Sequence, residues 1–479
     1  MKKSTGVVGV VVILGVAYLG ATWYVGKQAQ AAVERVVAQA NERVVKMLGA
    51  DMGTNSIRIE INDYQRGWFS SEVSYTLFLK DEDGKPLELK LHDKLQHGPL
   101  PVSALSSGDF MPMLAHSQAH LLATPATQKW FDSQNGKSPL NIETRVGFGG
   151  TGKSVWSFSP AELVEDGEKI SFSGGAIEMD FTNDFNDNTA TGQVASFSIT
   201  NEQSGESLLI KNIQGSSKTT MSNENDVSTQ SSATVDSLAI DSPDGGAVVL
   251  EKISMAVDSQ QKGKLLDGAL RYDFGRIAVG EIDLGSVSVG AKARQLDVDA
   301  LTELGKTYDA IVARADISAD EELVLTDAEE AVMREKLVAL LASSPSVSID
   351  PLIWKNAHGE SKAGLHLDLA SPSNAQEQRT DVLLAEVLKR VKLDLTISKP
   401  MLIQAFGQVE SDPQQAQQMQ ILGAMIYDQY VARLSGAGLV VVEGDTASAA
   451  ILYENDKVDL NGQAMSVPEF LQRAMSAVM

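Results

Sequence analysis

The sequence predicts a mostly β protein with an α+β C-terminal part. Three observations support this fold class. Apolar and polar residues alternate through residues 51–290, and Gly- and Asp-rich turn signals separate the alternating runs. After residue 290 the apolar spacing becomes helical, with further short strands between the helices. The chain has 479 residues, and 40 basic against 63 acidic side chains give a net charge of −23.

The first element is an apolar stretch at residues 6–25 that contains no charged residue. As a helix it would span about 30 Å, the thickness of the hydrocarbon core of a bilayer. Lys2 and Lys3 precede it, so we expect residues 1–5 in the cytoplasm, a single-pass anchor in a bacterial inner membrane, and a periplasmic body. The alternative is a cleaved signal peptide, because Ala29-Gln30-Ala31 resembles a cleavage site.

The second element is an amphipathic neck helix at residues 26–50. Val33, Val37 and Val44 recur at helical spacing between charged residues. Such a helix packs either on its own domain or on a second copy of the chain, and the pattern leaves both alternatives open.

Residues 51–290 are predicted to form a long antiparallel meander. Ile57, Ile59 and Ile61 are typical of its runs, since strict alternation indicates strands with one buried and one hydrated face. The polar stretch 216–237 is interpreted as strands around an exposed turn at residues 223–225. Residues 101–131 lack the alternation and are expected to form short helices or a packed loop.

Residues 291–479 are predicted to form an α+β domain. Thr326 and Glu329 form a capping-box pattern at the start of one of its helices. The helices are expected at residues 301–312, 326–341, 380–391 and 413–434, with another starting at Pro468. The strands are expected at 347–349, 365–369, 439–443, 449–453 and 457–460.

Several motifs resemble those of the bacterial YdgA-like (YdgA/YihF) family. The clearest is Tyr64-Gln65-Arg66-Gly67-Trp68-Phe69-Ser70-Ser71, and the others follow in the family's order along nearly the whole chain. The resemblance implies an inner-membrane anchor and no assigned activity, so it implies no catalytic residue, metal or cofactor. The motif positions are Tyr64, Arg66, Gly67, Phe69, Ser70, Ser71, His97, Gly98, Pro99, Gly174, Gly175, Trp354, Asn461 and Gly462.

These motifs also have a structural interpretation. The first is expected to form a bulge or tight connection at Trp68 and Phe69, with an aromatic ring anchored in the core. His97-Gly98-Pro99 is typical of a turn, and Asn461-Gly462 of a type I′ hairpin turn.

The sequence contains no complete catalytic motif, which favours a protein that is not an enzyme. His116 and His120 would share one helical face, but the tripeptide between them lacks the glutamate of a zinc hydrolase. The sequence contains no nucleophile elbow and no phosphate-binding loop, and the absence of cysteine excludes thiolate metal sites. The strong negative charge argues against nucleic-acid binding.

Two functions remain. By analogy at fold level with AsmA-like proteins, a curved sheet with one apolar face would bind or guide lipid or another apolar ligand. The alternative is a self-associating periplasmic scaffold that uses the neck or the Met- and Gln-rich helix at residues 413–434. An apolar face that stays uncovered along several strands would favour the ligand-binding function over the scaffold.

Overall fold

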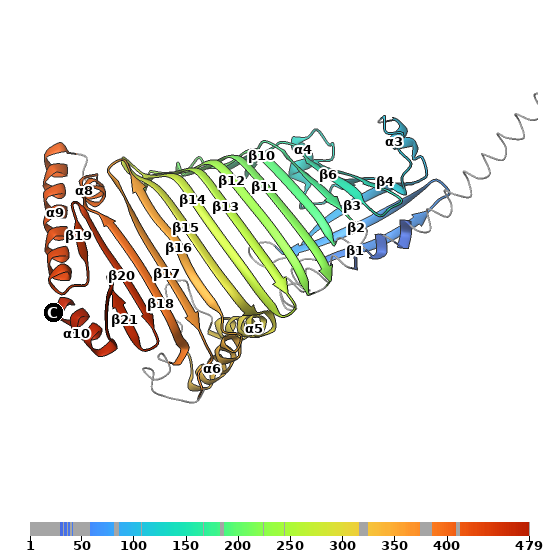
Figure 1. Cartoon of the computed structure of the whole chain (residues 1–479). Coiled ribbons are helices and arrows are strands. Elements are labelled where there is room, and N and C mark those ends of the chain that lie inside the picture. Colours follow the sequence, from blue (N-terminus) through green and yellow to red (C-terminus); the bar gives the residue numbers. More distant parts are fainter. Residues whose placement is uncertain are drawn as a thin grey trace, which may run out of the picture. The chain divides into compact units, whose positions relative to one another are not determined.

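The fold is described from a computed structural model of the chain (Figure 1). It consists of two compact units. Unit 1 comprises residues 1–203 and 211–218, and unit 2 comprises 204–210 and 219–479. The boundary predicted at residue 290 falls inside a continuous strand, β15 (Ile282–Asp297). The structure describes residues 29–31, 33–35, 37–38, 41, 58–80, 86–106, 108–165, 167–182, 186–223, 225–243, 245–315, 324–373, 386–408 and 412–478.

Unit 1 is an antiparallel meander, as the alternating pattern predicted. Its strands are β1 (Arg58–Arg66), β2 (Ser70–Lys80), β3 (Pro86–His97), β4 (Ala115–Leu121), β5 (Leu140–Val146), β6 (Gly152–Phe158), β7 (Ala161–Glu165), β8 (Glu168–Phe172), β9 (Gly175–Phe181) and β10 (Asp187–Asn201). The strands β1 to β6 pair in chain order, β9 joins β6 to β10, and β8 joins β7 to β10. Two short helices, α3 (Val102–Ser106) and α4 (Gln128–Ser133), lie in or at the end of the stretch 101–131, as predicted. The prediction is wrong for residues 115–121, which form strand β4 because they pair with β3 and β5.

Part of the apolar face of unit 1, on strands β3 to β5, is covered. Phe131 of α4 belongs to a cluster with the buried residues Leu121 and Leu140. The described positions between residues 29 and 41 are helical, and Ala29 packs against Leu95 in a second cluster. The neck therefore packs on its own unit at these positions, which was one of the two predicted alternatives.

The polar stretch 216–237 forms strands, as predicted. β11 (Ser207–Asn223) ends and β12 (Asp226–Ser242) begins around a short turn, where the backbone N–H of Asn225 donates to the Asn223 side chain. Small hydroxylated side chains at alternate positions are compatible with strands, because they cover a hydrated face without burying large apolar area.

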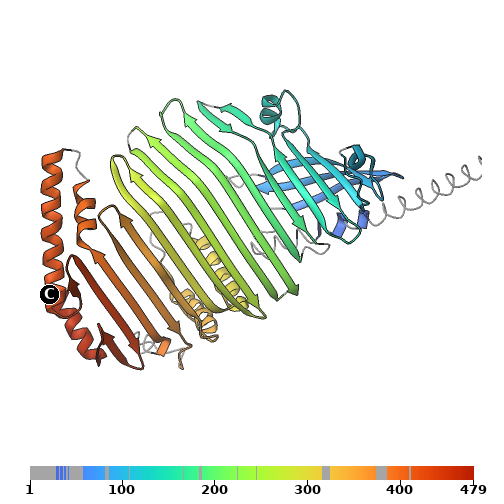
Figure 2. The ribbon, with the colours of Figure 1, turned by 45° about the horizontal axis from the view of Figure 1, so that its top comes forward.

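Unit 2 contains a twisted antiparallel layer of long strands (Figure 2). The strands from β12 to β18 pair in chain order, then β20 pairs with β18, β19 and β21, and β21 with β22. Besides β12 and β15, the strands are β13 (Gly246–Lys262), β14 (Leu265–Val279), β16 (Ser346–Asn356), β17 (Gly359–Leu369), β18 (Leu388–Ser398), β19 (Val441–Glu443), β20 (Thr446–Glu454), β21 (Lys457–Leu460) and β22 (Gln463–Ser466).

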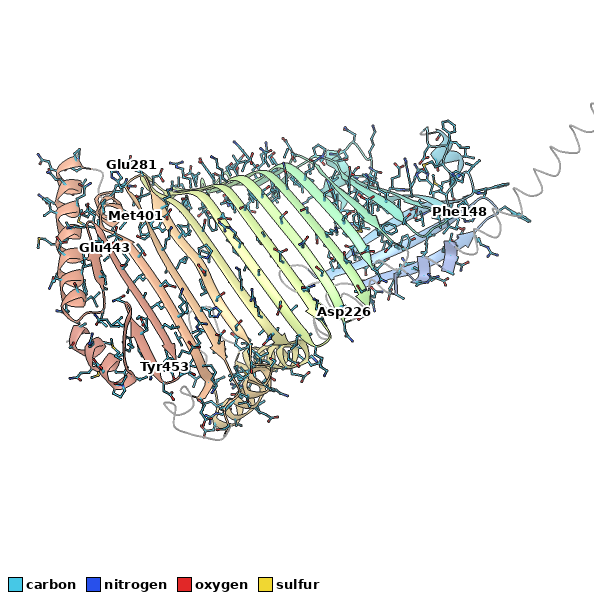
Figure 3. The ribbon with its side chains drawn as sticks, viewed as in Figure 1. Phe148, Asp226, Glu281, Met401, Glu443 and Tyr453 are labelled. Atoms are coloured by element: carbon cyan, nitrogen blue, oxygen red, sulfur yellow. The ribbon has the colours of Figure 1, made fainter. Side chains whose placement is uncertain are left out.

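The helices of unit 2 leave its strands at opposite ends. α5 (Val298–Ala315) follows β15 and packs on α6 (Asp327–Leu341), whereas α8 (Lys399–Gly407) follows β18 and packs on α9 (Pro413–Gly436). In Figure 3, Met401 of α8 and Tyr453 of β20 mark these two ends. The last helix, α10 (Val467–Val478), packs on β21 and β22.

Most helices match the predictions, with two differences. The predicted capping box at Thr326 and Glu329 is confirmed, and α9 matches the helix expected at residues 413–434. The helix predicted at residues 380–391 is wrong from residue 388 onward, where β18 pairs with β17 and β20. The apolar residues Val391, Leu393 and Leu395 have period two, and this outweighs the helical spacing before them. Helix α8 was not predicted.

Among the described residues, no helix has the length and apolar character needed to cross a bilayer. The predicted anchor at residues 6–25 lies outside the described residues, whereas Ala29-Gln30-Ala31, the alternative cleavage site, lies in a described helical segment.

Candidate functional sites

The first candidate site is where nine of the motif residues meet in unit 1. β1 and β2 form a hairpin in which the backbone N–H of Gly67 donates to Ser70 at 2.8 Å. A side chain at Gly67 would place its Cβ 2.8 Å from the Ser70 carbonyl oxygen, so the turn requires glycine. The predicted tight connection is confirmed. The predicted burial of an aromatic ring there is wrong, because Trp68 and Phe69 lie at the tip and are 63% and 50% exposed.

Two polar residues of these motifs are buried together behind the hairpin. Ser71 of β2 and His97 of β3 are each 1% exposed, and Ser71 Oγ lies 2.8 Å from His97 Nε2. The backbone N–H of His97 donates to the Phe69 carbonyl, which fastens the hairpin to β3. Burial lowers the pKa of His97, while the Trp68 backbone opposes the shift, so the imidazole is neutral at neutral pH.

A serine and a histidine at this distance have the geometry of a nucleophile and its base. Here both side chains are buried, so the serine hydroxyl is not exposed to solvent. The Tyr64 hydroxyl is also buried beside Ser71, and burial raises its pKa. The described contacts of the motif connect the β1–β2 hairpin to the end of β3.

A pH dependence follows from His97. As the pH falls below about 6.5, the unfolded chain takes up a proton before the native imidazole does, so the free energy of unfolding falls. In urea titrations between pH 5 and 8, we expect His97→Asn to reduce this slope by up to about 1.4 kcal/mol per pH unit. The exposed His358 offers a matched control, His358→Asn, and equal slopes in the two variants would contradict the assignment.

Further buried polar groups lie nearby in unit 1. Asp93 of β3 is buried, and burial raises the pKa of its carboxyl although Ser117 and Tyr75 donate hydrogen bonds to it. His116, fully buried, contacts the hydroxyl of Ser103 and lies 3.0 Å from a Glu143 oxygen.

His116 and His120 do not share a helical face as predicted, because both lie on strand β4. The ring of His120 meets that of His92 edge-on, with 5.4 Å between centroids, and burial lowers the pKa of His120. Within the described ranges, no group of three or more His, Asp or Glu side chains is placed to hold a metal ion.

The other motif residues belong to other turns and strands. Gly174 has a φ of 81° between β8 and β9, where a Cβ would lie 2.7 Å from the Phe158 carbonyl oxygen. In unit 2, the indole N–H of Trp354 donates to the Leu284 carbonyl at 2.6 Å. Asn461 and Gly462 both have positive φ between β21 and β22, which confirms the predicted type I′ turn.

The second candidate site is one face of the sheet in unit 2, which we call the apolar face. Residues directly opposite each other in antiparallel strands point to the same face, so the register defines it. Three rows cross the strands from β13: Met255, Tyr272, Val289, Leu352, Ala363 and Leu395; Val257, Leu270, Ala291, Ile349, Leu365 and Leu393; and Ile253, Phe274, Val287 and Trp354.

No position in these three rows is occupied by a charged residue, and none of the side chains is fully buried in the described part of the chain. Tyr272, Ile349 and Leu352 are 36%, 42% and 40% exposed. In unit 1, by contrast, the residues beneath α4 and the neck, such as Leu121 and Leu95, are buried. The apolar face of unit 2 therefore carries no comparable second layer among the described residues.

The opposite face of the same strands, which we call the polar face, holds the charges. Arg271, Lys292 and Lys362 alternate along their strands with residues of the apolar face. The sheet is therefore amphipathic. Its apolar face is about 24 Å wide, because the six strands from β13 to β18 are separated by five inter-strand spacings of about 4.8 Å.

Fold and sites together define a mostly β protein with amphipathic antiparallel sheets, one of them with an apolar face open in the described structure. A family model described as "Bacterial protein of unknown function (DUF945)" matches residues 1–468. The chain belongs to this family, as the motifs in its sequence predicted.

Two relatives from Escherichia coli (strain K12) match over nearly their whole length. "Protein YdgA" is 28% identical, covering 98% of this chain and 96% of its own, and "Uncharacterized protein YihF" is 26% identical over 99% of both. An uncharacterised Haemophilus influenzae protein is 24% identical over 41% of this chain and 52% of its own. No solved structure matches the chain.

Proposed function

We propose that this protein is a non-enzymatic cell-envelope protein that binds or guides lipid or another apolar ligand. In this proposal residues 6–25 anchor it in the bacterial inner membrane and its body lies in the periplasm. The observation that carries the proposal is the apolar face of unit 2, which has no charged side chain and no fully buried one among the described residues.

The energetic argument is that exposed apolar area is unfavourable in water. Monomeric soluble proteins rarely expose contiguous apolar patches of more than a few hundred Å², and larger ones mark binding sites. Each methylene group removed from water contributes about 0.8 kcal/mol, so an acyl chain lying across several strands would be held by several kcal/mol. The face offers no ionisable partner except the Tyr272 hydroxyl, which suits a hydrocarbon ligand.

The test is mass spectrometry of lipids that co-purify with the full-length protein after extraction in mild detergent. We expect a lipid at a stoichiometry above that of an unrelated single-pass membrane protein prepared in parallel. A lipid content equal to that of the control protein would refute the proposal.

A second candidate function, self-association, is favoured by α9. This helix has only two charged residues, and one of them, Asp428, is paired with Lys399 at 2.6 Å. Met425 and Tyr430 are 62% and 61% exposed, and Leu422 and Ile426 continue an exposed apolar stripe at helical spacing. A chain of net charge −23 would associate most easily through such an uncharged surface.

Light scattering on the detergent-solubilised full-length protein tests this second candidate. We expect a dimer for the wild type and a monomer for Met425→Glu, because a carboxylate buried in the interface would cost several kcal/mol. Gln414→Glu adds the same charge at the start of α9, away from the stripe, and should remain a dimer. A wild-type monomer would exclude self-association.

A further inference from the structure

A pocket of about 220 Å³ opens on the polar face of unit 2, away from the apolar face. Ser346, Ser348 and Gly364 are small residues that leave it room, and the long side chains of Lys292, Arg294 and Lys392 also line it. The register places Lys292, Ser348, His366 and Lys392 in one row across β15 to β18, and Arg294 and Ser346 in the next row.

The basic side chains of this pocket differ in their pairing. The Lys392 ammonium pairs with Asp394 at 2.7 Å. The side chains of Lys292 and Arg294, in contrast, form no ion pair or hydrogen bond with any residue that the structure describes. Elsewhere on the polar face, Lys362 pairs with Glu360 at 2.6 Å and Arg271 with Asp273 at 2.7 Å.

Lys292 and Arg294 thus keep two unpaired positive charges in a chain that carries 63 acidic against 40 basic side chains. Lys292 and Arg294 are two residues apart on one strand, so their Cα atoms are separated by about 7 Å and both side chains lie on the same face. The strand arrangement thus gathers two unpaired cations beside two serine hydroxyls.

We propose that this pocket binds a single phosphate group. A guanidinium presents paired N–H donors that match two oxygens of a tetrahedral oxyanion, an ammonium adds a second charge, and serine hydroxyls donate further hydrogen bonds. Asp350 and Asp394 also line the pocket and lower the formal charge of its three basic side chains from +3 to +1, which leaves attraction for one phosphate and not for two. The proposal does not depend on the apolar ligand, because the two sites lie on opposite faces of the sheet.

The test uses the detergent-solubilised full-length protein in calorimetric titrations at low ionic strength, where charge interactions are least screened. The probe is inorganic phosphate, followed by glycerol 3-phosphate. We expect Lys292→Gln/Arg294→Gln to weaken binding by about tenfold or more, since two charge-assisted interactions are lost. The control Lys355→Gln/Lys362→Gln removes two charges from the same face outside the pocket and should change the affinity less than about twofold.

Lipids added to the same detergent micelles distinguish a lipid headgroup from a soluble phosphate. Displacement of bound glycerol 3-phosphate by phosphatidylglycerol but not by phosphatidylcholine would identify an anionic headgroup as the source. Binding of glycerol 3-phosphate that neither lipid displaces would identify a soluble phosphate. The proposal is overturned if no probe binds, or if the pocket and control variants lose affinity equally while circular dichroism shows both to be folded.

Discussion

Replacing Gly98 with alanine is expected to destabilise unit 1 by at least about 3 kcal/mol, because the new methyl group has no space. The added Cβ would overlap the carbonyl oxygen of Met113 and lie 3.1 Å from that of Leu114. The backbone here is fixed on both sides: the Gly98 N–H donates to Leu114, and the Met113 N–H donates to Pro99. Relief of the clash would therefore break hydrogen bonds that join the end of β3 to the start of β4.

Urea denaturation followed by circular dichroism measures this effect. Gly149→Ala is the matched control in unit 1, since a Cβ there meets nothing within 4 Å and the residue does not have a positive φ. We expect the control to stay within about 0.5 kcal/mol of the wild type. A Gly98→Ala protein as stable as the control would show that the turn can move, and that the motif does not fasten β3 to β4.

The second large effect is expected for Leu352→Glu on the apolar face. Leu352 is 40% exposed in the middle of the face, opposite Val289 and Ala363. Its carboxylate can remain hydrated in the unliganded protein, so we expect the free energy of unfolding to change by less than about 1.5 kcal/mol. A bound acyl chain would have to desolvate the charge at a cost of several kcal/mol, which lowers affinity by about a hundredfold.

The neighbouring residue supplies the control. Ile353 lies on the polar face, opposite Ser288 and Lys362, so Ile353→Glu introduces the same charge one residue away without touching the apolar face. Lipid content by mass spectrometry and binding of the neutral fluorescent probe N-phenyl-1-naphthylamine should fall in Leu352→Glu and persist in Ile353→Glu. Equal losses in both variants would mean that the apolar face is not the binding surface.

Features set by a few neighbouring residues could be predicted from the sequence. The capping box of Thr326 and Glu329 involves residues three positions apart, and the Asn461-Gly462 turn depends on two residues that tolerate positive φ. The strands of the meander also follow from local alternation, because period two is a property of the backbone itself.

Features that depend on distant partners could not be predicted. Residues 388–391 continue a helical-looking pattern, yet they form a strand because β17 and β20 flank them and supply hydrogen bonds on both sides. The spacing of His116 and His120 fits a helix as well as a strand, and pairing with β3 and β5 decides it. Trp68 and Phe69 are apolar, but the hairpin turn places them at its exposed tip.

The candidate sites divide in the same way. The motif residues could be recognised in the sequence. The sequence did not predict that Ser71 and His97, which are 26 residues apart, form a buried pair. Nothing in the spacing of Lys292, Arg294 and Lys392 indicated a pocket, because the register of β15 to β18 brings them together.

The sequence by itself determined that this chain is mostly β, that it belongs to its family, and that its strands have one apolar and one polar side. These are local or compositional properties, and alternation encodes them residue by residue. Only the tertiary structure decided which apolar faces are covered. Amphipathic strands look alike whether a helix packs on them or not. In unit 1 the described part of the neck and α4 bury the apolar face on β3 to β5, and in unit 2 α10 packs on β21 and β22, whereas α5 and α8 leave the sheet at the ends of its strands.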